Sequence, residues 1–203
     1  MGRTLQQLEK DLEKIMSEIE ELKKGKKIRF EKKLEIGDAF TLAGVQWKIL
    51  DITVQGYHCL ADKIGEDMVF SDSGNDWRKS SLRAYLNGEF LEKLAEEIGK
   101  ENIIPFQRNL LSLDGQTEYG TCEDMVSLLN VDEYRKYRPL IPNTDDYWWW
   151  LITAWSTPCN KYYALVAVVS PSGNIFNYYF CNNCNGVRPF CIFSPSIFES
   201  EEE

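Results

Sequence analysis

The stretch from Tyr147 to Phe193 most limits what this chain can fold into, because it combines many aromatic side chains with very little charge. It holds four of the six tryptophans and four of the six cysteines of the 203-residue chain. No charged residue lies between Tyr162 and Val187. The apolar run from Ala164 to Val169, rich in β-branched residues, predicts a strand that is buried in a core.

The segment from Asn174 to Asn185 is different, because aromatic residues, asparagines and cysteines mix there without the period of a strand or of a helix. Regular-looking segments flank the irregular parts, Trp148–Leu151 before them and Gly186–Phe190 after them. Adjacent tryptophans on a strand point to both faces of its sheet, so we assign Trp148, Trp149 and Trp150 mainly to the core. The whole stretch indicates a rigid scaffold that displays chemically varied side chains.

Residues 4–24 predict a helix with a narrow apolar seam. The seam residues alternate in spacing between three and four, which places them at successive a and d positions of a heptad: Leu5, Leu8, Leu12, Ile15, Ile19 and Leu22. The other positions are nearly all polar, so the helix has no second face to bury. We therefore expect residues 1–27 to form an oligomerising coiled coil, and an isoleucine at a d position favours three chains.

The charge of the chain limits its partners. The net charge is −9, with +1 in the first 27 residues and −10 in the remainder. Phosphate binding needs a basic footprint, so we expect no nucleic-acid partner. The first residues lack the apolar core of a signal peptide, and no run approaches the roughly 18 apolar residues of a membrane helix. We expect a protein made in the cytoplasm, without membrane insertion and with its six cysteines mostly as thiols.

Residues 28–198 predict one α+β domain, followed by an acidic tail over 199–203. Turn sequences separate three short strands, which we expect to form a meander: Phe40–Leu42, Val45–Ile52 and Tyr57–Ala61. The best helix of the domain is predicted over 79–99, with Ser80 or Ser81 as its cap and an interruption at Asn87-Gly88. Residues 121–129 fit either a short helix or a strand, and 131–137 predict a further helix.

Several motifs along this domain resemble a known family. They are Trp77–Asn87, Phe90, Trp149–Leu151, Gly173 and Gly186–Pro189. In this order they are similar to bacterial and phage domains of the DUF6273 type, which look related to the formylglycine-generating-enzyme variety of the C-type lectin fold. The resemblance covers about residues 34–193 and excludes the N-terminal helix. It implies a C-type lectin-like α+β domain.

Members of this family serve as variable proteins of diversity-generating retroelements. A reverse transcriptase there copies a template with errors at adenines, so that asparagine codons become codons for residues such as Tyr, Phe, Ser, Cys, Ala and Ile. The resemblance implies a variable region over about 148–190. Its candidate ligand-binding residues are those that such rewriting can produce: Ile152, Ala154, Thr157, Cys159, Asn160, Tyr162, Tyr163, Phe176, Asn177, Tyr178, Tyr179, Phe180, Cys181, Asn182, Asn183 and Cys184.

The residues that remain on such a surface are rich in Tyr, Phe and Asn, which combine large contact area with adaptable hydrogen bonds. We expect 152–163 and 176–185 to converge on one exposed face that recognises a protein or glycan ligand on another cell or particle. The family also implies assembly on a bacteriophage particle. A non-variable structural or adhesion subunit of a phage or bacterial surface stays open as an alternative. We expect Arg188 to pair with a buried carboxylate or with carbonyls beneath the binding surface, which is a structural role.

Enzymatic and metal-binding alternatives have weaker support in the sequence. Cys181 and Cys184 form a CxxC pair, and the related oxidases hold copper through two cysteines, but the flanking residues do not resemble that motif. Zinc needs two further ligands, and the single histidine, His58, fits a packing or edge role. Calcium needs a cage of carboxylates, which this region lacks. We therefore expect no catalytic residue, no metal and no cofactor.

Overall fold

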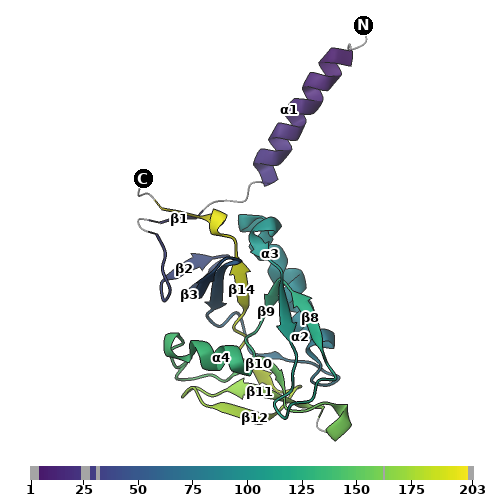
Figure 1. Ribbon diagram of the computed structural model, residues 1–203, viewed down its shortest axis with the longest axis vertical. Helices are drawn as coiled ribbons and strands as arrows, with labels where there is room; N and C mark the ends of the chain where they lie inside the picture. Colours follow the sequence, from purple (N-terminus) through teal and green to yellow (C-terminus); the bar gives the residue numbers. More distant parts are fainter. Residues whose placement is uncertain (1–4, 24–27, 31–32, 162, 201–203) are drawn as a thin grey trace.

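The computed structural model describes residues 5–23, 28–30, 33–161 and 163–200. A long helix, α1 (Leu5–Lys23), extends away from an α+β body formed by the rest of the chain (Figure 1). The predicted N-terminal helix is thus confirmed, and the seam side chains that the structure describes (Leu5, Leu8, Leu12 and Ile15) are exposed. Self-association through this seam stays a prediction.

The main sheet of the body is antiparallel and places a C-terminal strand at its centre. The order is β2 (Ala39–Leu42), β3 (Val45–Thr53), β4 (Gly56–Ala61), β14 (Phe190–Phe193) and β6 (Ile103–Ile104), and β9 (Val126–Ser127) also pairs with β14. The predicted meander of β2, β3 and β4 is confirmed, because short turns join strands whose apolar residues face the core.

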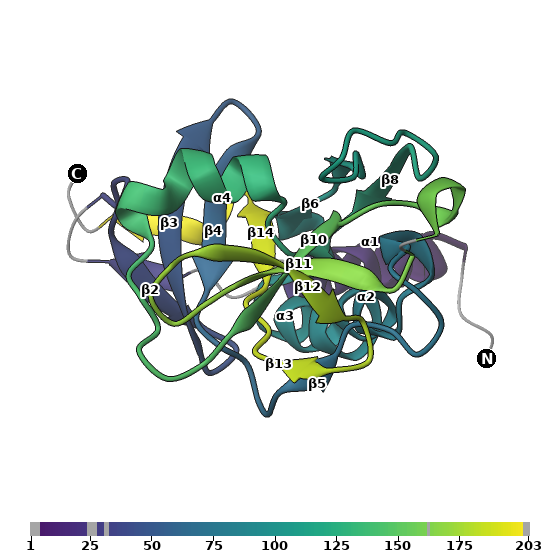
Figure 2. The same ribbon diagram turned by 90° about the horizontal axis from the view of Figure 1, so that it is seen from below.

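A second sheet lies at the end of the body remote from α1 (Figure 1), and Figure 2 shows it in the foreground. Its order is β10 (Trp149–Ala154), β11 (Leu165–Val169) and β12 (Ile175–Phe180). The buried strand expected at residues 164–169 is confirmed as β11. The lack of regular structure expected from Asn174 onward is wrong for β12. Aromatic and β-branched residues favour strands, and pairing with β11 supplies the order that local periodicity did not predict.

The helices of the body follow the expected segments closely. Residues 77–98 form η1 (Trp77–Lys79), α2 (Ser81–Tyr85), the π-helical turn η2 (Leu86–Phe90) and α3 (Leu91–Ile98). Ser80 caps α2 by accepting a hydrogen bond from the backbone N–H of Arg83, and the interruption expected at Asn87-Gly88 lies in the π-helical turn. A capping box of Asn130 and Glu133 begins α4 (Val131–Tyr137). Short 3-10 turns complete the set: η3 (Lys100–Asn102), η4 (Arg138–Leu140), η5 (Pro158–Asn160) and η6 (Pro195–Ile197).

Three two-stranded sheets join distant parts of the chain. They are β1 (Ile28–Phe30) with β15 (Phe198–Ser200), β5 (Met68–Val69) with β13 (Cys184–Asn185), and β7 (Phe106–Asn109) with β8 (Thr121–Asp124). Residues 121–129 are therefore strands, one of the two expected alternatives. The acidic tail begins later than expected, because Glu199 and Ser200 pair in parallel with β1. Residues 201–203 lie outside the described part of the chain.

The tryptophan run belongs to the core, as expected. Trp149 and Trp150 are buried, while Trp148 is half-buried and packs edge-on against Phe176. The indole of Trp150 donates a 2.8 Å hydrogen bond to the carbonyl of Met68. The buried apolar side chains form two core clusters, and Trp148 and Trp150 pack in one of them while Trp149 packs in the other. Because it is held by both clusters, β10 serves as a scaffold for the segments that follow it. Among the described helices, none combines the length and the apolar character that crossing a membrane requires.

Candidate ligand-binding face

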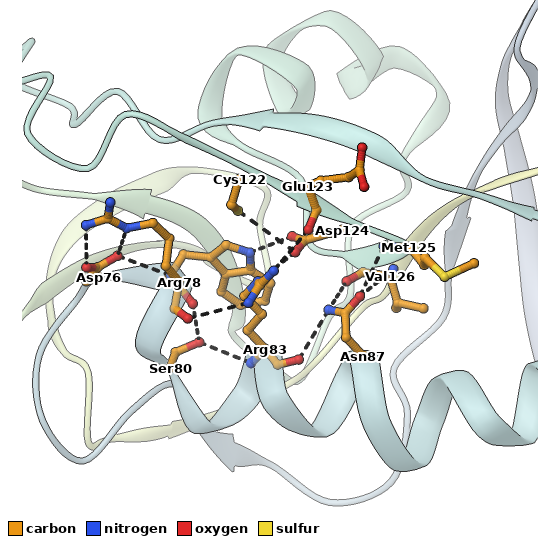
Figure 3. A network of polar contacts seen from close by, with 11 residues as sticks. Asp76, Arg78, Ser80, Arg83, Asn87, Cys122, Glu123, Asp124, Met125 and Val126 are labelled. Carbon is orange, nitrogen blue, oxygen red and sulfur yellow. Dashed lines mark hydrogen bonds and ion pairs between the residues drawn. The ribbon is translucent and has the colours of Figure 1, made fainter.

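The motif Trp77–Asn87 attaches helix α2 to strands β8 and β9 (Figure 3). The carboxylate of Asp124 is fully buried and accepts a 2.7 Å hydrogen bond from the indole of Trp77. It also forms a 2.6 Å ion pair with the guanidinium of Arg83. Arg83 also donates to the carbonyl of Glu123 at 3.0 Å. A buried carboxylate is stable only when charged and neutral donors satisfy it, as they do here. The residues that carry the family resemblance therefore build the scaffold in this region.

Asn87 continues the same attachment through its amide (Figure 3). Its side-chain nitrogen donates to the carbonyl of Val126 at 2.7 Å, and its oxygen accepts from the backbone N–H groups of Met125 and Val126. The side chain thus pairs with β9 as another strand would. Asp124 and this role of Asn87 were not predicted, because the partners lie some 40 residues away in the sequence.

Asn75 joins three loops beneath the candidate face. It is buried, and its side-chain nitrogen donates to the carbonyls of Ser156 (2.9 Å) and Leu165 (2.8 Å). Its backbone N–H donates to the carbonyl of Tyr163 at 2.7 Å, and its side-chain oxygen accepts from the hydroxyl of Tyr119 at 2.6 Å. The loop from Asp72 to Asp76 therefore fixes the geometry of the segments that carry the candidate residues.

Four of the predicted ligand-binding residues are not on an exposed face: Ile152, Ala154, Thr157 and Cys181. Ile152 and Ala154 belong to β10, every residue of which is buried between the two core clusters. Cys181 is buried because its backbone lies between Ala164 and Phe70, with which it forms hydrogen bonds. The expectation that these four side chains lie on an exposed face is wrong, because all four are buried.

Seven predicted residues are exposed, and we call them the distal face: Cys159, Asn160, Tyr163, Phe180, Asn182, Asn183 and Cys184. Phe176 is only half-buried and packs on Trp148. Tyr162 lies outside the described residues. Asn177, Tyr178 and Tyr179 lie in β12, but their side chains are outside what the structure describes.

The backbone brings the two halves of the distal face side by side. Leu165 pairs with Phe180 across β11 and β12, and the N–H of Cys181 donates to the carbonyl of Ala164 at 2.7 Å. Tyr163 (51 % exposed) and Phe180 (56 % exposed) therefore emerge from neighbouring backbone segments. The expected convergence of 152–163 with 176–185 on one ligand-binding face stays a prediction, and this backbone pairing places 163–165 beside 180–181.

Two carboxylates outside the predicted region hold the turn η5 in place. The thiol of Cys159 donates to Glu118 at 3.1 Å, and the amide of Asn160 donates to Asp114 at 2.9 Å. The hydrogen bond from Cys159 lowers the pKa of the Glu118 carboxyl below its ordinary value. Both acids lie in the loop between β7 and β8, so this loop forms a fixed border of the distal face.

A hollow of about 190 Å³ lies beside Tyr163, between loop 71–79 and residues 118–119. On its wall, Arg78 pairs with both carboxylate oxygens of Asp76, at 2.9 and 2.7 Å, and its guanidinium lies 5.5 Å from the ring centre of Tyr119. Burial raises the pKa of Tyr119 to about 12, so its hydroxyl remains a donor to Asn75 at neutral pH. Charged groups thus border a face whose predicted ligand-binding residues are uncharged.

The CxxC cysteines, Cys181 and Cys184, and the histidine His58 lie in different environments. Burial raises the pKa of the Cys181 thiol, whereas Cys184 is exposed. His58 lies in β4, where its Nε2 is 3.0 Å from the hydroxyl of Thr53 and its ring packs near Phe190. Among the described residues, no three His, Cys, Asp or Glu side chains form a group that could hold a metal ion.

Arg188 has the structural role that the sequence predicts. It is buried, its Nε donates to the carbonyl of Ala61 at 3.0 Å, and its Nη2 is 3.4 Å from Asp62. The guanidinium also lies over the ring of Trp149 at 5.1 Å. Asp62 is largely exposed, so the carbonyl and the indole, more than a buried carboxylate, hold this arginine.

Comparison of the chain with family models, with curated proteins and with solved structures found no match.

Proposed function

We propose that the chain is a ligand-binding protein that presents the distal face to a protein or glycan on another cell or particle. The observation that carries the proposal is the exposed pair Tyr163 and Phe180, which two neighbouring backbone segments present together. Large aromatic side chains exposed side by side are unusual without a partner. Aromatic anchors surrounded by asparagine amides are also the composition that recognition surfaces favour.

The support beneath the face fits this role. Asn75, the indoles of β10 and the acids of the loop 110–120 fix the segments from below and from the side. Preorganised segments lose less conformational entropy on binding, so a rigid support raises the affinity that a given set of side chains can reach. Substitutions at the five exposed positions other than Cys159 and Asn160, whose side chains bond to these acids, would change the ligand while leaving this support intact.

We further propose that the domain is a C-type lectin-like variable protein of a diversity-generating retroelement. All seven residues of the distal face are types that rewriting of asparagine codons can produce. The side chains that organise the support, such as Asn75, Asp124 and Arg188, are buried apart from them. Four buried residues of the predicted variable region fit better as scaffold than as rewritten positions.

DNA sequencing around the gene tests the retroelement proposal directly. We expect a neighbouring reverse-transcriptase gene and an imperfect repeat of the 3′ coding end that differs at adenines. The codons of Tyr163 and Phe180 should differ between related isolates, whereas those of Ile152 and Ala154 should not. A genome without such a repeat contradicts the retroelement proposal but leaves ligand binding by a fixed surface in place.

A library at the distal face tests ligand binding itself. Randomising the seven positions on displayed protein should keep most variants folded, as measured by resistance to protease. Randomising Ile152, Ala154, Thr157 and Cys181 in a matched library should leave few variants folded. Equal loss of folding in both libraries contradicts the proposal, because a recognition surface has to tolerate change.

We also propose that α1 joins several chains. Leu5, Leu8, Leu12 and Ile15 are exposed on the described part of the helix, at the heptad spacing of a coiled coil. The distal face lies at the other end of the body (Figure 1), so association through α1 would leave it free and repeat it in each assembly. Light scattering should give about three chains per particle for the full chain. A chain beginning at Ile28 should sediment as a smaller species.

A further inference from the structure

An apolar hollow of about 670 Å³ lies on the body near the end of α1. It is lined by Lys33–Ile36, Ile52, Tyr57 and Pro195, and we call it the proximal hollow. Ile36 (52 % exposed) and Ile52 (39 % exposed) are among the few large apolar side chains that the described part of the body exposes. Val54, two residues after Ile52, is also exposed. The other large apolar side chains exposed in the described part of the body are Leu111, Tyr163 and Phe180.

The connectivity of the chain ties this hollow to α1. Helix α1 ends at Lys23 and β1 begins at Ile28, and five residues of extended chain span at most about 18 Å. Lys33 follows β1 by three residues, and Pro195 precedes β15, the partner of β1. Tyr57, which lines the hollow, also packs on Phe198 of β15 at 4.5 Å between ring centres. A parallel association of several copies of α1 therefore brings their proximal hollows close together.

We propose that the proximal hollow is a contact surface between copies of this chain, seated against the body of a neighbouring chain in the assembly that α1 organises. The rim carries opposite charges on a short segment, Lys33 and Glu35, both exposed. The Lys33 side chain of one copy can pair with Glu35 of the next, so the surface is complementary to itself. This inference goes beyond ligand binding and rests on the proposed association through α1.

The length of α1 supports a second contact. The helix has 19 residues, fewer than three heptads, and short helices depend on packing for most of their stability. Contact at the proximal hollow would remove two exposed isoleucines per chain from water. It would also fix the bodies relative to one another, so that the distal faces of all copies point the same way.

Sedimentation of the full chain over a range of concentrations tests the proposal. Replacing Ile36 and Ile52 together by Asp should raise the dissociation constant of the assembly by about tenfold or more. The matched control is Leu111→Asp, the same kind of change at an exposed apolar residue outside the hollow, which should leave the constant within about twofold. Circular dichroism melting of each variant shows whether the body remains folded.

A charge exchange gives a second reading that does not depend on the aspartate variants folding. Lys33→Glu and Glu35→Lys should each weaken the assembly, and the double variant should recover most of the loss because the pairs re-form with reversed sign. An unchanged dissociation constant in folded I36D/I52D protein overturns the proposal, as does a double exchange no better than the single changes. A wild-type chain that stays monomeric at about 100 µM overturns it too, since no assembly then forms for the proximal hollow to join.

Discussion

The hydroxyl of Tyr119 donates a 2.6 Å hydrogen bond to the side-chain oxygen of Asn75, in the buried space below the distal face. The nitrogen of the same amide donates to two carbonyls, those of Ser156 and Leu165. One side chain thus satisfies groups from two other segments, and the loops that carry the distal face depend on it.

Replacing Asn75 by Ala should lower the free energy of unfolding by about 2–4 kcal/mol. The change leaves the buried Ser156 carbonyl and the Tyr119 hydroxyl without their partner, and each unsatisfied group costs about 1–3 kcal/mol before relaxation. The Leu165 carbonyl keeps its bond from the backbone N–H of Trp155. Tyr119→Phe removes a single hydrogen bond and should cost about 1 kcal/mol. Urea unfolding measures both. Asn160→Ala, which removes an exposed amide, is the control. If it lowered the free energy of unfolding as much as N75A does, the central role of Asn75 would be contradicted.

The stability of the chain should fall at alkaline pH, partly through Tyr119. Burial raises its pKa in the folded state to about 12, above the ordinary value of about 10 in the unfolded chain. Below pH 10 both states hold the proton and stability is unaffected. Between about pH 10 and 12 the unfolded chain loses the proton first, so stability declines as the pH rises. The stability difference between wild type and Tyr119→Phe should therefore shrink from pH 8 to pH 11.5.

Urea midpoints of the two proteins at both pH values check this expectation. Tyr163→Phe, at an exposed side chain, serves as the control and should match wild type at each pH. A difference between wild type and Y119F that stays constant or widens above pH 10 would show that the Tyr119 hydroxyl is not protected by burial.

Asp124→Asn should destabilise the body by about 3 kcal/mol. The substitution leaves the Arg83 guanidinium without its carboxylate and weakens the bond from the Trp77 indole, and removing one member of a buried pair costs about 3–5 kcal/mol. Arg83 is partly exposed, which favours the lower end of that range. Asp132→Asn breaks an exposed pair with Arg135 and should change stability by less than about 0.5 kcal/mol. Equal effects in chemical denaturation would refute the structural role of the motif.

Tyr163→Ser and Phe180→Ser should each shift the free energy of unfolding by less than about 0.5 kcal/mol, because exposed positions rarely matter more. Trp150→Ala should cost about 3–5 kcal/mol, as truncation of a buried indole does. Thermal and urea melts of the three variants separate surface from core. Unfolding of the Phe180 variant would place this side chain in the core and remove the distal face as described.

Ile152→Asn tests the corrected boundary of the face. Asparagine at this buried position of β10 has no described polar partner, and burying an unpaired amide costs about 1–3 kcal/mol beyond the lost packing. Phe180→Asn, at an exposed position of the same predicted region, should be nearly neutral. Denaturation midpoints that move equally in the two variants would restore the wider face that the sequence predicts.

The sequence predicts those parts of the fold that local signals determine. The heptad of α1, the meander β2–β4 and the buried indoles of β10 follow from periodicity and side-chain size, which act within a few residues. Thr157 shows the limit, since a polar residue between a serine and a proline carries no sign that the surrounding loops bury it completely. Asn75 shows the same limit, because its partners lie 44, 81 and 90 residues away.

Strand β12 was missed for a related reason. Its sequence, Ile175 to Phe180, has no alternation of apolar and polar residues, yet the strand forms because β11 offers a free edge. Assigning every residue of a charge-free segment to one surface also ignores that neighbouring side chains on a strand point to opposite sides. The family resemblance marked the region, but burial decided which of its residues face outward.

Strands β1 and β15 run in parallel, with Ile28 opposite Phe198 and Phe30 opposite Ser200. A pull on α1 enters β1 at its N-terminal end, and a pull on the C-terminus enters β15 at its C-terminal end. Opposed forces on parallel neighbours act along the strands, so all the hydrogen bonds of the pair are loaded together and do not open one by one. Tension applied between the two ends of the chain is therefore carried in shear across these three residue pairs before it reaches the sheet that supports the distal face.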